Sequence, residues 1–349
     1  MGLFDKLFGK KENTALEPNP APAVPQPSKR DLIESAIASN PNSARFRAEY
    51  TEDANFQILD FWDYVTKESP LSFVSFDLET TGLDSVDDAI VEIGAVRVVN
   101  GEITEKFHQL IDPERPVSPD ASSVNHITDD MLVGKPRIYE ILPDFLSFVG
   151  SDVLVAHNVR FDSAFISKAC LRYRFIYPKT YFDSRDLSVI WPDLPNRKLS
   201  TFLDAAGINN AEAHRALSDA ESLAQLMIVS MNTEFSSPLP AGFDPGYSND
   251  HFTGTVDIVD QKLSKKRFVL TGKIGDDDRV EFEKMILSHG GKCTQKISSA
   301  TDYLVVGSFP GLPSNYVTSK VAYARKLIAE GGKIEIISPS DVLSMLEDI

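Results

Sequence analysis

The distribution of hydrophobic positions divides the chain into two regions with the pattern of an α/β fold. Between residues 71 and 235, four apolar runs are typical of buried strands, namely FVSFDLET, AIVEIGAVRVV, KFHQLI and DVLVAH. The segment RIYEILPDFLSFVG has helical periodicity, and further helices are expected from about Phe161 and about Ala213. Strands that alternate with helices in this way indicate an α/β domain with a mixed sheet.

A second, smaller pattern begins at Lys262. Strands are predicted at RFVLTG, KCTQKI, DYLVVG and IEIIS, and helices at VEFEKMILSHGG, TSKVAYARKLIAEGG and PSDVLSML. Residues 236–261 hold proline, glycine and aspartate without periodicity and are interpreted as a linker. The proline-rich stretch NTALEPNPAPAVPQPSK predicts a disordered tail and spacer over residues 1–30. The expected organisation is therefore tail 1–30, N-terminal helical extension 31–70, domain 71–235, linker 236–261 and domain 262–349.

Charge is distributed unevenly over these regions. The whole chain has a formal net charge of -16, and residues 71–235 hold 14 basic and 25 acidic side chains. Residues 262–349 hold 13 basic and 11 acidic side chains, so this region alone is mildly basic. Different regions are therefore expected to do different work.

Cysteine content and hydropathy limit the class of protein. The two cysteines, Cys170 and Cys293, are far apart and lack CxxC spacing, which argues against a disulfide framework or a cysteine-bound zinc. No apolar run is long enough for a membrane span, and MGLFDKLFGKKE lacks the apolar core of a secretory signal. We expect a cytoplasmic protein. A short amphipathic helix at residues 1–12 would at most give weak docking to a partner or a membrane surface.

Four carboxylates and one histidine are predicted at the ends of elements in residues 71–235. Asp77 and Glu79 lie two residues apart on an apolar strand and therefore point to the same side. Asp162 follows a short strand in AHNVRFD, and His214 precedes Asp219 by five residues in HRALSD. Carboxylate ligands suit Mg²⁺ or Mn²⁺, and two such ions would neutralise acids that could not otherwise share a site in ionised form. Two ions also suit phosphodiester hydrolysis, and histidine is a suitable general base for the attacking water.

The wording and order DLETTG, AHNVRFD and HRALSDA resemble the DEDDh exonuclease family, whose members include ribonuclease T and the proofreading subunit of bacterial replicative DNA polymerase. The resemblance extends from about Leu71 to Asn232. It implies a ribonuclease-H-like fold with a mixed five-stranded sheet and an active 3′→5′ exonuclease. The implied metal-binding acids are Asp77, Glu79, Asp162 and Asp219, with Asp77 shared by both ions and His214 as the base. Thr80, Thr81 and Gly82 would then lie beside the 3′-terminal nucleotide.

Three further stretches near these motifs also bear on the site. The family often has V-H-G-I-T where this chain has Val124-Asn125-His126-Ile127-Thr128, a departure that concerns contacts to the substrate end. Asp183 matches a family aspartate and is interpreted as structural. His157 is expected to hold the second motif by hydrogen bonds instead of binding metal.

Residues 262–349 resemble a BRCT domain, and the nearest subtype is that of NAD-dependent DNA ligase and the clamp-loader large subunit. The resemblance rests on RFVLTG, SHGGKCTQKISSATDYLVVG and TSKVAYARKLIAEGGKIEIIS. It implies a small α/β domain with a parallel four-stranded sheet. The tryptophan of many last BRCT helices is missing, and Val342 and Leu343 lie in that region.

The same resemblance implies a phosphate pocket formed by Thr271, Gly272, Arg279 and Lys320. A hydroxyl, a backbone N–H and two cations are suitable anion ligands. A plain docking module with a solvated Lys320 is the alternative, and the three aspartates 276–278 would repel a nearby phosphate.

The sequence is best interpreted as a two-metal 3′→5′ exonuclease that releases nucleoside 5′-monophosphates, with a BRCT domain for binding DNA ends or a partner. Single-stranded or frayed 3′ ends of nucleic acid are the expected substrate, and DNA is favoured because BRCT domains belong to DNA metabolism. A DNA polymerase or a repair protein is a candidate partner. An exoribonuclease that trims RNA and a non-catalytic phosphate-binding adaptor are the alternatives.

Overall fold

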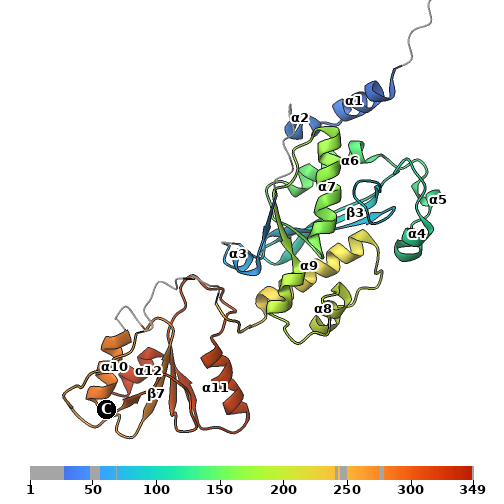
Figure 1. Ribbon diagram of the computed structural model, residues 1–349. Coiled ribbons are helices and arrows are strands. Elements are labelled where there is room, and N and C mark those ends of the chain that lie inside the picture. Colours follow the sequence, from blue (N-terminus) through green and yellow to red (C-terminus); the bar gives the residue numbers. More distant parts are fainter. Residues whose placement is uncertain are drawn as a thin grey trace, which may run out of the picture.

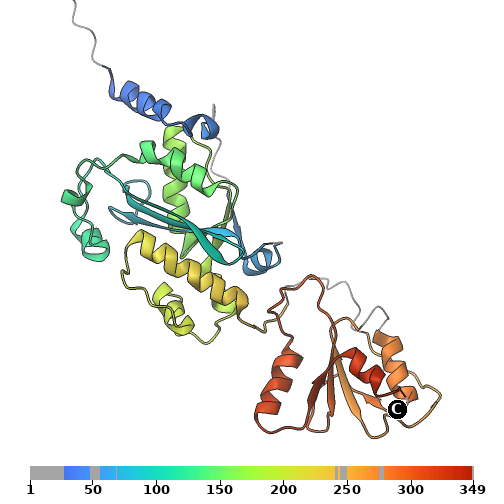
Figure 2. The same cartoon turned by 180° about the vertical axis from the view of Figure 1, so that it is seen from behind.

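The computed structural model describes residues 27–47, 56–67, 69–239, 243, 250–274 and 279–347. In Figures 1 and 2 the chain forms two α/β units, each with its own sheet, connected after helix α9 (Ala216–Asn232). The amphipathic segment expected at residues 1–12, most of the expected tail and the aspartates 276–278 lie outside the described residues.

The larger unit contains a mixed six-stranded sheet in the order β1-β6-β5-β2-β3-β4. β2, β3 and β4 are antiparallel neighbours, whereas β2, β5, β6 and β1 run parallel. Its strands are β1 (Gln57–Leu59), β2 (Phe73–Thr80), β3 (Ile90–Val99), β4 (Glu102–Leu110), β5 (Leu154–Ala156) and β6 (Thr180–Asp183). The predicted α/β class with a mixed sheet is confirmed. The sheet has one strand more than expected, because β1 comes from the segment that was predicted as a helical extension.

Helices cover both faces of this sheet (Figures 1 and 2). Val74 and Phe76 share a core with α6 and α7, whereas Phe73 shares the opposite core with α8 and α9. Because strand side chains alternate, Asp77 and Glu79 point toward the α9 side. The helices of the unit are α1 (Lys29–Ser39), α2 (Ser43–Phe46), α3 (Phe61–Val65), α4 (Pro119–Asn125), α5 (Asp129–Leu132), α6 (Ile138–Val149), α7 (Val159–Tyr173), the 3-10 helix η1 (Ser184–Val189), α8 (Leu199–Ala206) and α9.

The smaller unit has the predicted parallel four-stranded sheet, and its strands lie in the order β10-β9-β7-β8. One face packs against α10 and α12 and the other against α11. Val342, in the region where many BRCT domains carry a tryptophan, is completely buried, so the smaller side chain still fills the core. The elements are β7 (Arg267–Thr271), α10 (Arg279–Ser288), β8 (Lys292–Cys293), β9 (Tyr303–Val306), α11 (Ser319–Ala329), β10 (Glu335–Ile337) and α12 (Pro339–Ser344).

The two units contact each other through the loop before α11 and the residues after α9. The Phe235 N–H donates to the Asn315 carbonyl at 3.0 Å, and the Val317 N–H donates to the Phe235 carbonyl at 2.9 Å. The rings of Trp62, Phe235 and Tyr316 lie 5.6–5.8 Å apart between centroids. Backbone pairing and aromatic packing therefore act together at this contact.

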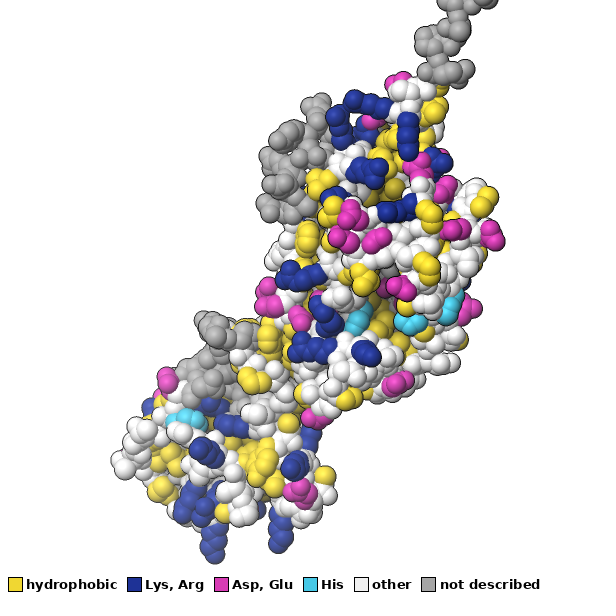
Figure 3. All heavy atoms as spheres, turned by 45° about the vertical axis from the view of Figure 1, so that its right-hand side comes forward, with side chains coloured by type: hydrophobic (Ala, Val, Ile, Leu, Met, Phe, Trp, Pro, Cys, Tyr) yellow, Lys and Arg dark blue, Asp and Glu magenta, His cyan; other side chains and the backbone are white. Residues whose placement is uncertain are grey.

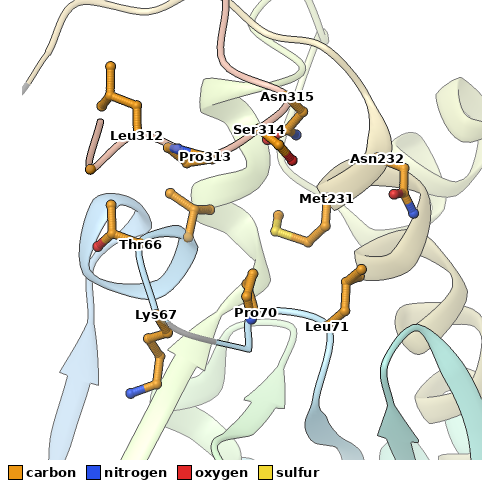
Figure 4. Close-up of a pocket in the computed structure, with 12 residues that line it drawn as sticks. Thr66, Lys67, Pro70, Leu71, Met231, Asn232, Leu312, Pro313, Ser314 and Asn315 are labelled. Atoms are coloured by element: carbon orange, nitrogen blue, oxygen red, sulfur yellow. The ribbon is translucent and has the colours of Figure 1, made fainter. Parts of the chain in front are cut away.

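A cavity of about 340 Å³ lies beside the aromatic contact and is lined by both units. In Figure 4, Leu312 and Pro313 lie on one side of it, and Pro70 and Leu71 lie on the other. The two units are thus in direct contact at the aromatic rings and are separated by the cavity next to them.

Among the described residues, no helix is long and apolar enough to cross a membrane. On the face shown in Figure 3, lysine and arginine side chains lie on both units, and acidic side chains are more numerous on the larger one. The acidic side chains on this face are therefore most numerous on the unit whose sequence is most acidic.

Candidate metal and nuclease site

Three of the predicted acids converge at the end of β2. The side chains of Asp77, Glu79 and Asp219 each offer a carboxylate oxygen within 4.8 Å of the others. Asp77 and Glu79 lie near the C-terminal end of β2, and Asp219 lies in the first turn of α9. The fourth acid, Asp162, is buried in the first turn of α7, close enough for its charge to raise the pKa of Asp77.

The surroundings of these acids oppose ionisation. Burial raises the pKa of Asp77 well above its usual range, and the charges of Asp162, Glu79 and Asp219 raise it further. Burial, followed by the charge of Asp219, raises the pKa of Glu79 to about 8. The pKa values of Asp162 and Asp219 are also raised, in both cases mainly by burial. A cluster of this kind fits divalent cations, which would compensate the charge that the protein itself leaves uncompensated.

His214 lies next to this cluster, in the turn directly before α9. Its side chain is exposed, its backbone has a left-handed φ of 64°, and its N–H donates to Asp219 Oδ2 at 3.0 Å. Asn210 donates to the other oxygen of Asp219 through its side-chain amide. The position of the His214 backbone is therefore coupled to a predicted metal ligand.

The loop after β2 brings backbone close to the acidic cluster. The Thr80 hydroxyl donates to the Gly82 carbonyl at 2.6 Å, and the Thr81 hydroxyl donates to Asp88 Oδ1 at 3.0 Å. A Cβ atom at Gly82 would lie 2.3 Å from a carboxylate oxygen of Asp88, so a larger residue would displace the Asp88 side chain that Thr81 contacts. The side-chain amide of Asn125 donates to the Thr80 carbonyl at 3.3 Å. The stretch 124–128, which departs from the family pattern V-H-G-I-T, therefore contacts this loop.

His157 and Asp183 have hydrogen-bonded roles within the protein. His157 Nε2 lies 2.8 Å from the Arg197 carbonyl, which can only accept, and Nδ1 lies 2.9 Å from the Ser184 hydroxyl. Burial lowers the pKa of His157, which favours the neutral ring, with Nε2–H donating to the Arg197 carbonyl. Asp183 accepts from the Arg185 side chain and from the backbone N–H of Asn158. Both residues hold the segment that carries Asp162.

Glu92 and Arg215 were not singled out in the sequence, yet they join two elements of the site. Glu92 lies opposite Glu79 in the β2–β3 register and binds Arg215, the residue after His214. The sequence does contain a sign of this pair, because Glu92 is a single acid within the apolar strand AIVEIGAVRVV. A charge buried in such a strand requires a partner.

The smaller unit brings together the predicted phosphate-binding cations. Arg279 is buried, and its charge contributes, after burial, to a lowered pKa of Lys320. Lys320 Nζ donates to the Leu270 carbonyl at 3.0 Å. Gly272 follows β7 with a φ of 82°, and a Cβ there would lie 2.8 Å from the Ser308 carbonyl.

Other side chains complete these surroundings. The Thr271 and Thr318 hydroxyls lie 3.3 Å apart. Glu283, which the sequence analysis did not select, is buried near Lys320 and accepts from His251 and from the Phe252 N–H. The two cations therefore have an acidic neighbour that lessens the positive charge offered to an anion.

Comparison with known proteins places these two units in families. Residues 74–227 match the family described as Exonuclease, and residues 259–346 match the family described as the BRCA1 C Terminus (BRCT) domain. The chain thus contains an exonuclease domain followed by a BRCT domain.

The chain is 38% identical over 169 residues to the DNA polymerase III PolC-type of Caldanaerobacter subterraneus subsp. tengcongensis, a match that covers 47% of this chain and 12% of that protein. It is 49% identical over 106 residues to the DNA polymerase III subunit epsilon of Treponema pallidum, covering 30% of this chain and 49% of that protein. A solved structure of exonuclease X in complex with 5′ overhanging duplex DNA is 30% identical, with a TM-score of 0.38 and coverage of 46% of this chain and 91% of the other. The chain spans less than half the length of these two curated relatives.

Proposed function

We propose that this protein is a metal-dependent 3′→5′ exonuclease that acts on DNA and releases nucleoside 5′-monophosphates. The observation that carries the proposal is the convergence of Asp77, Glu79 and Asp219 within 4.8 Å, with Asp162 beside Asp77. The match to the exonuclease family supports the reaction class. The names of the similar DNA polymerase III proteins favour DNA as the substrate.

The proposed cofactors are two Mg²⁺ or Mn²⁺ ions held by Asp77, Glu79, Asp162 and Asp219. Oxygen-only ligands and partly buried acids with raised pKa values fit hard divalent cations. Such ions supply the positive charge that activates water and stabilises a leaving oxygen in phosphodiester hydrolysis. By the family resemblance, Asp77 would be the ligand that both ions share, and the charges of all three other acids raise the pKa of its carboxyl.

The remaining roles belong to the protein's own side chains and backbone. His214, exposed next to Asp219, accepts the proton of the attacking water. The Thr80 and Thr81 hydroxyls already have acceptors within the loop, so they shape it. The loop from Thr80 to Gly82 then presents its backbone to the 3′-terminal nucleotide.

The deciding experiment is a time course on matched 5′-labelled single-stranded DNA and RNA with Mg²⁺, Mn²⁺ or EDTA. We expect a metal-dependent ladder that shortens from the 3′ end, faster on DNA, and a loss of about 10³-fold or more in Asp77→Ala. Glu221→Ala is the matched control, because Glu221 is an acid on α9 that pairs with Lys106 away from the cluster. A faster RNA ladder would favour the exoribonuclease, and no ladder on either substrate would favour the adaptor.

We further propose that the BRCT domain binds a DNA 5′-phosphate or a phosphorylated partner, such as a polymerase or repair protein, through Thr271, Gly272, Arg279 and Lys320. The proximity of Arg279 and Lys320 supports an anion site. Lys320→Ala should weaken binding to 5′-phosphorylated DNA by about ten-fold without changing turnover of short single strands. Lys326→Ala on the same helix is the control. Equal affinity of the wild type for phosphorylated and unphosphorylated DNA would contradict this proposal.

A further inference from the structure

Glu92 is a completely buried carboxylate with a full set of partners beside the candidate site. Its Oε1 accepts from Arg215 Nη2 at 2.7 Å and lies 2.6 Å from His108 Nε2. Its Oε2 accepts from Arg215 Nε at 3.2 Å and from the backbone N–H of Ala216 at 3.0 Å. The Arg215 guanidinium therefore binds the carboxylate with two parallel hydrogen bonds, which fixes orientation as well as charge.

These bonds fix the chain immediately after His214. Arg215 is the N-cap residue of α9, and its carbonyl accepts from the N–H of Asp219 at 2.9 Å. The His214 N–H in turn donates to the Asp219 carboxylate. Glu92 on β3 thus holds the start of α9, and the start of α9 carries both His214 and Asp219.

Charge neutralisation is a second effect of the pair. Burial alone would raise the pKa of Glu92, but the hydrogen bonds from Arg215, His108 and Ala216 lower it below its usual value. The negative charge of Glu92 raises the pKa values of Asp77, Glu79 and Asp219. Arg215 therefore limits the repulsion that a fifth acid adds to the cluster.

We propose that Glu92 and Arg215 are a pair of positioning residues for catalysis, which hold His214 in the place where it can accept a proton from the attacking water. The inference rests on the proposed function, because it requires that His214 act in the reaction. Arg215 and Glu92 act through their neighbours. Their loss should therefore lower kcat more than it raises KM.

A double-mutant cycle tests this role. Arg215→Lys keeps the positive charge but cannot make the two parallel bonds, so we expect kcat to fall about ten-fold with KM changed less than about two-fold. In a His214→Ala background, the same change should lower the residual kcat by less than about two-fold. This variant has no catalytic histidine whose position Arg215 could fix. Glu92→Gln tests the pair from the other side and should show the same dependence on His214.

Arg97→Lys is the matched control, because Arg97 is also on β3 and also pairs with a carboxylate, that of Asp152. It should leave kcat unchanged even where it lowers the melting temperature. An equal loss of kcat in both backgrounds would overturn the inference and leave the proposed function intact. A wild-type protein without metal-dependent turnover would overturn both.

Discussion

Glu79 is a residue at which burial and neighbouring acids oppose the charged state that metal binding needs. Its pKa is raised to about 8 by burial, Asp219 and Glu92, and the pKa values of Asp77, Asp162 and Asp219 are shifted in the same direction. Between about pH 4.5 and 8, the folded protein without metal therefore holds protons that the unfolded chain has lost. The free energy of unfolding should fall as the pH rises through this window.

This fall in the free energy of unfolding with rising pH gives a prediction for the metal-free protein. The melting temperature of the EDTA-treated protein should fall between pH 5 and pH 8, and Mg²⁺ or Mn²⁺ should raise it more at pH 8 than at pH 5. Asp77→Asn should have a shallower pH dependence, because one buried acid no longer titrates. Scanning calorimetry measures both effects, with Asp120→Asn, an exposed acid of α4, as the control. A metal-free wild type whose melting temperature is constant or rises over this range would contradict the assignment of the cluster.

Some of the individual residues of the candidate site could be predicted from the sequence. The acids of DLETTG, AHNVRFD and HRALSD were selected because their wording and order are distinctive, and the structure brings Asp77, Glu79 and Asp219 together. Glu92 and Glu283 were not selected, because each lies inside an element whose other residues are apolar or unremarkable. Their importance comes from partners distant in the chain, which only the folded arrangement reveals.

At the scale of the element, the contact between β3 and α9 depends on the absence of a side chain at Gly94. Gly94 lies opposite Asp77 in the β2–β3 register. A Cβ atom at this position would lie 2.1 Å from the Leu217 nitrogen and 2.2 Å from the Ala216 carbonyl carbon. Since these atoms are backbone, α9 as a whole would have to move away from the sheet, and Asp219 would move with it.

Gly94→Ala should therefore destabilise the protein by about 1–3 kcal/mol and lower nuclease activity as well. Urea denaturation and the ladder assay measure the two effects. Gly207→Ala is the matched control, because Gly207 has a positive φ of 69° but no atom near its Cβ position. It should cost about 1 kcal/mol and leave activity unchanged. Full activity in a stably folded Gly94→Ala protein would show that α9 tolerates the shift.

The elements differ in how well the sequence predicted them. The long runs that became β2, β3 and α6 have clear periodicity, and the structure confirms them. β1 and β6 have three and four residues, too few for a pattern; β6 is formed by pairing with β5 and β1, and β1 by pairing with β6. The predicted strand KCTQKI shortens to Lys292–Cys293 at the edge of its sheet, where only one neighbour stabilises it.

At the scale of the whole molecule, the aromatic contact between the two units sets their relative position. The rings of Trp62, Phe235 and Tyr316 all contact one another, and Tyr316 is contributed by the smaller unit. Leu59 and Phe61 of the same extension are buried in the core of the larger unit. The extension before residue 70 thus helps to build both the sheet and the contact between units.

Tyr316→Ala should separate the units without unfolding either of them. The chain has two tryptophans, so in a Trp191→Phe background the emission of Trp62 reports on the contact. We expect a red shift of this emission and a larger radius of gyration by small-angle scattering, since Trp62 gains contact with water. Tyr323→Ala is the control, because Tyr323 lies exposed on α11 of the same unit. Unchanged emission in Tyr316→Ala would contradict the described contact.

The pairing of Phe235 with Asn315 and Val317 has a consequence for the chain between the two units. Both partners belong to one polypeptide, so the two units meet within the chain and the contact does not depend on the protein concentration. A contact too weak to join two separate proteins can then hold the units together in the intact chain. Insertions after Ser237 should loosen the contact only gradually with added length, while the same units made as separate proteins should scarcely associate.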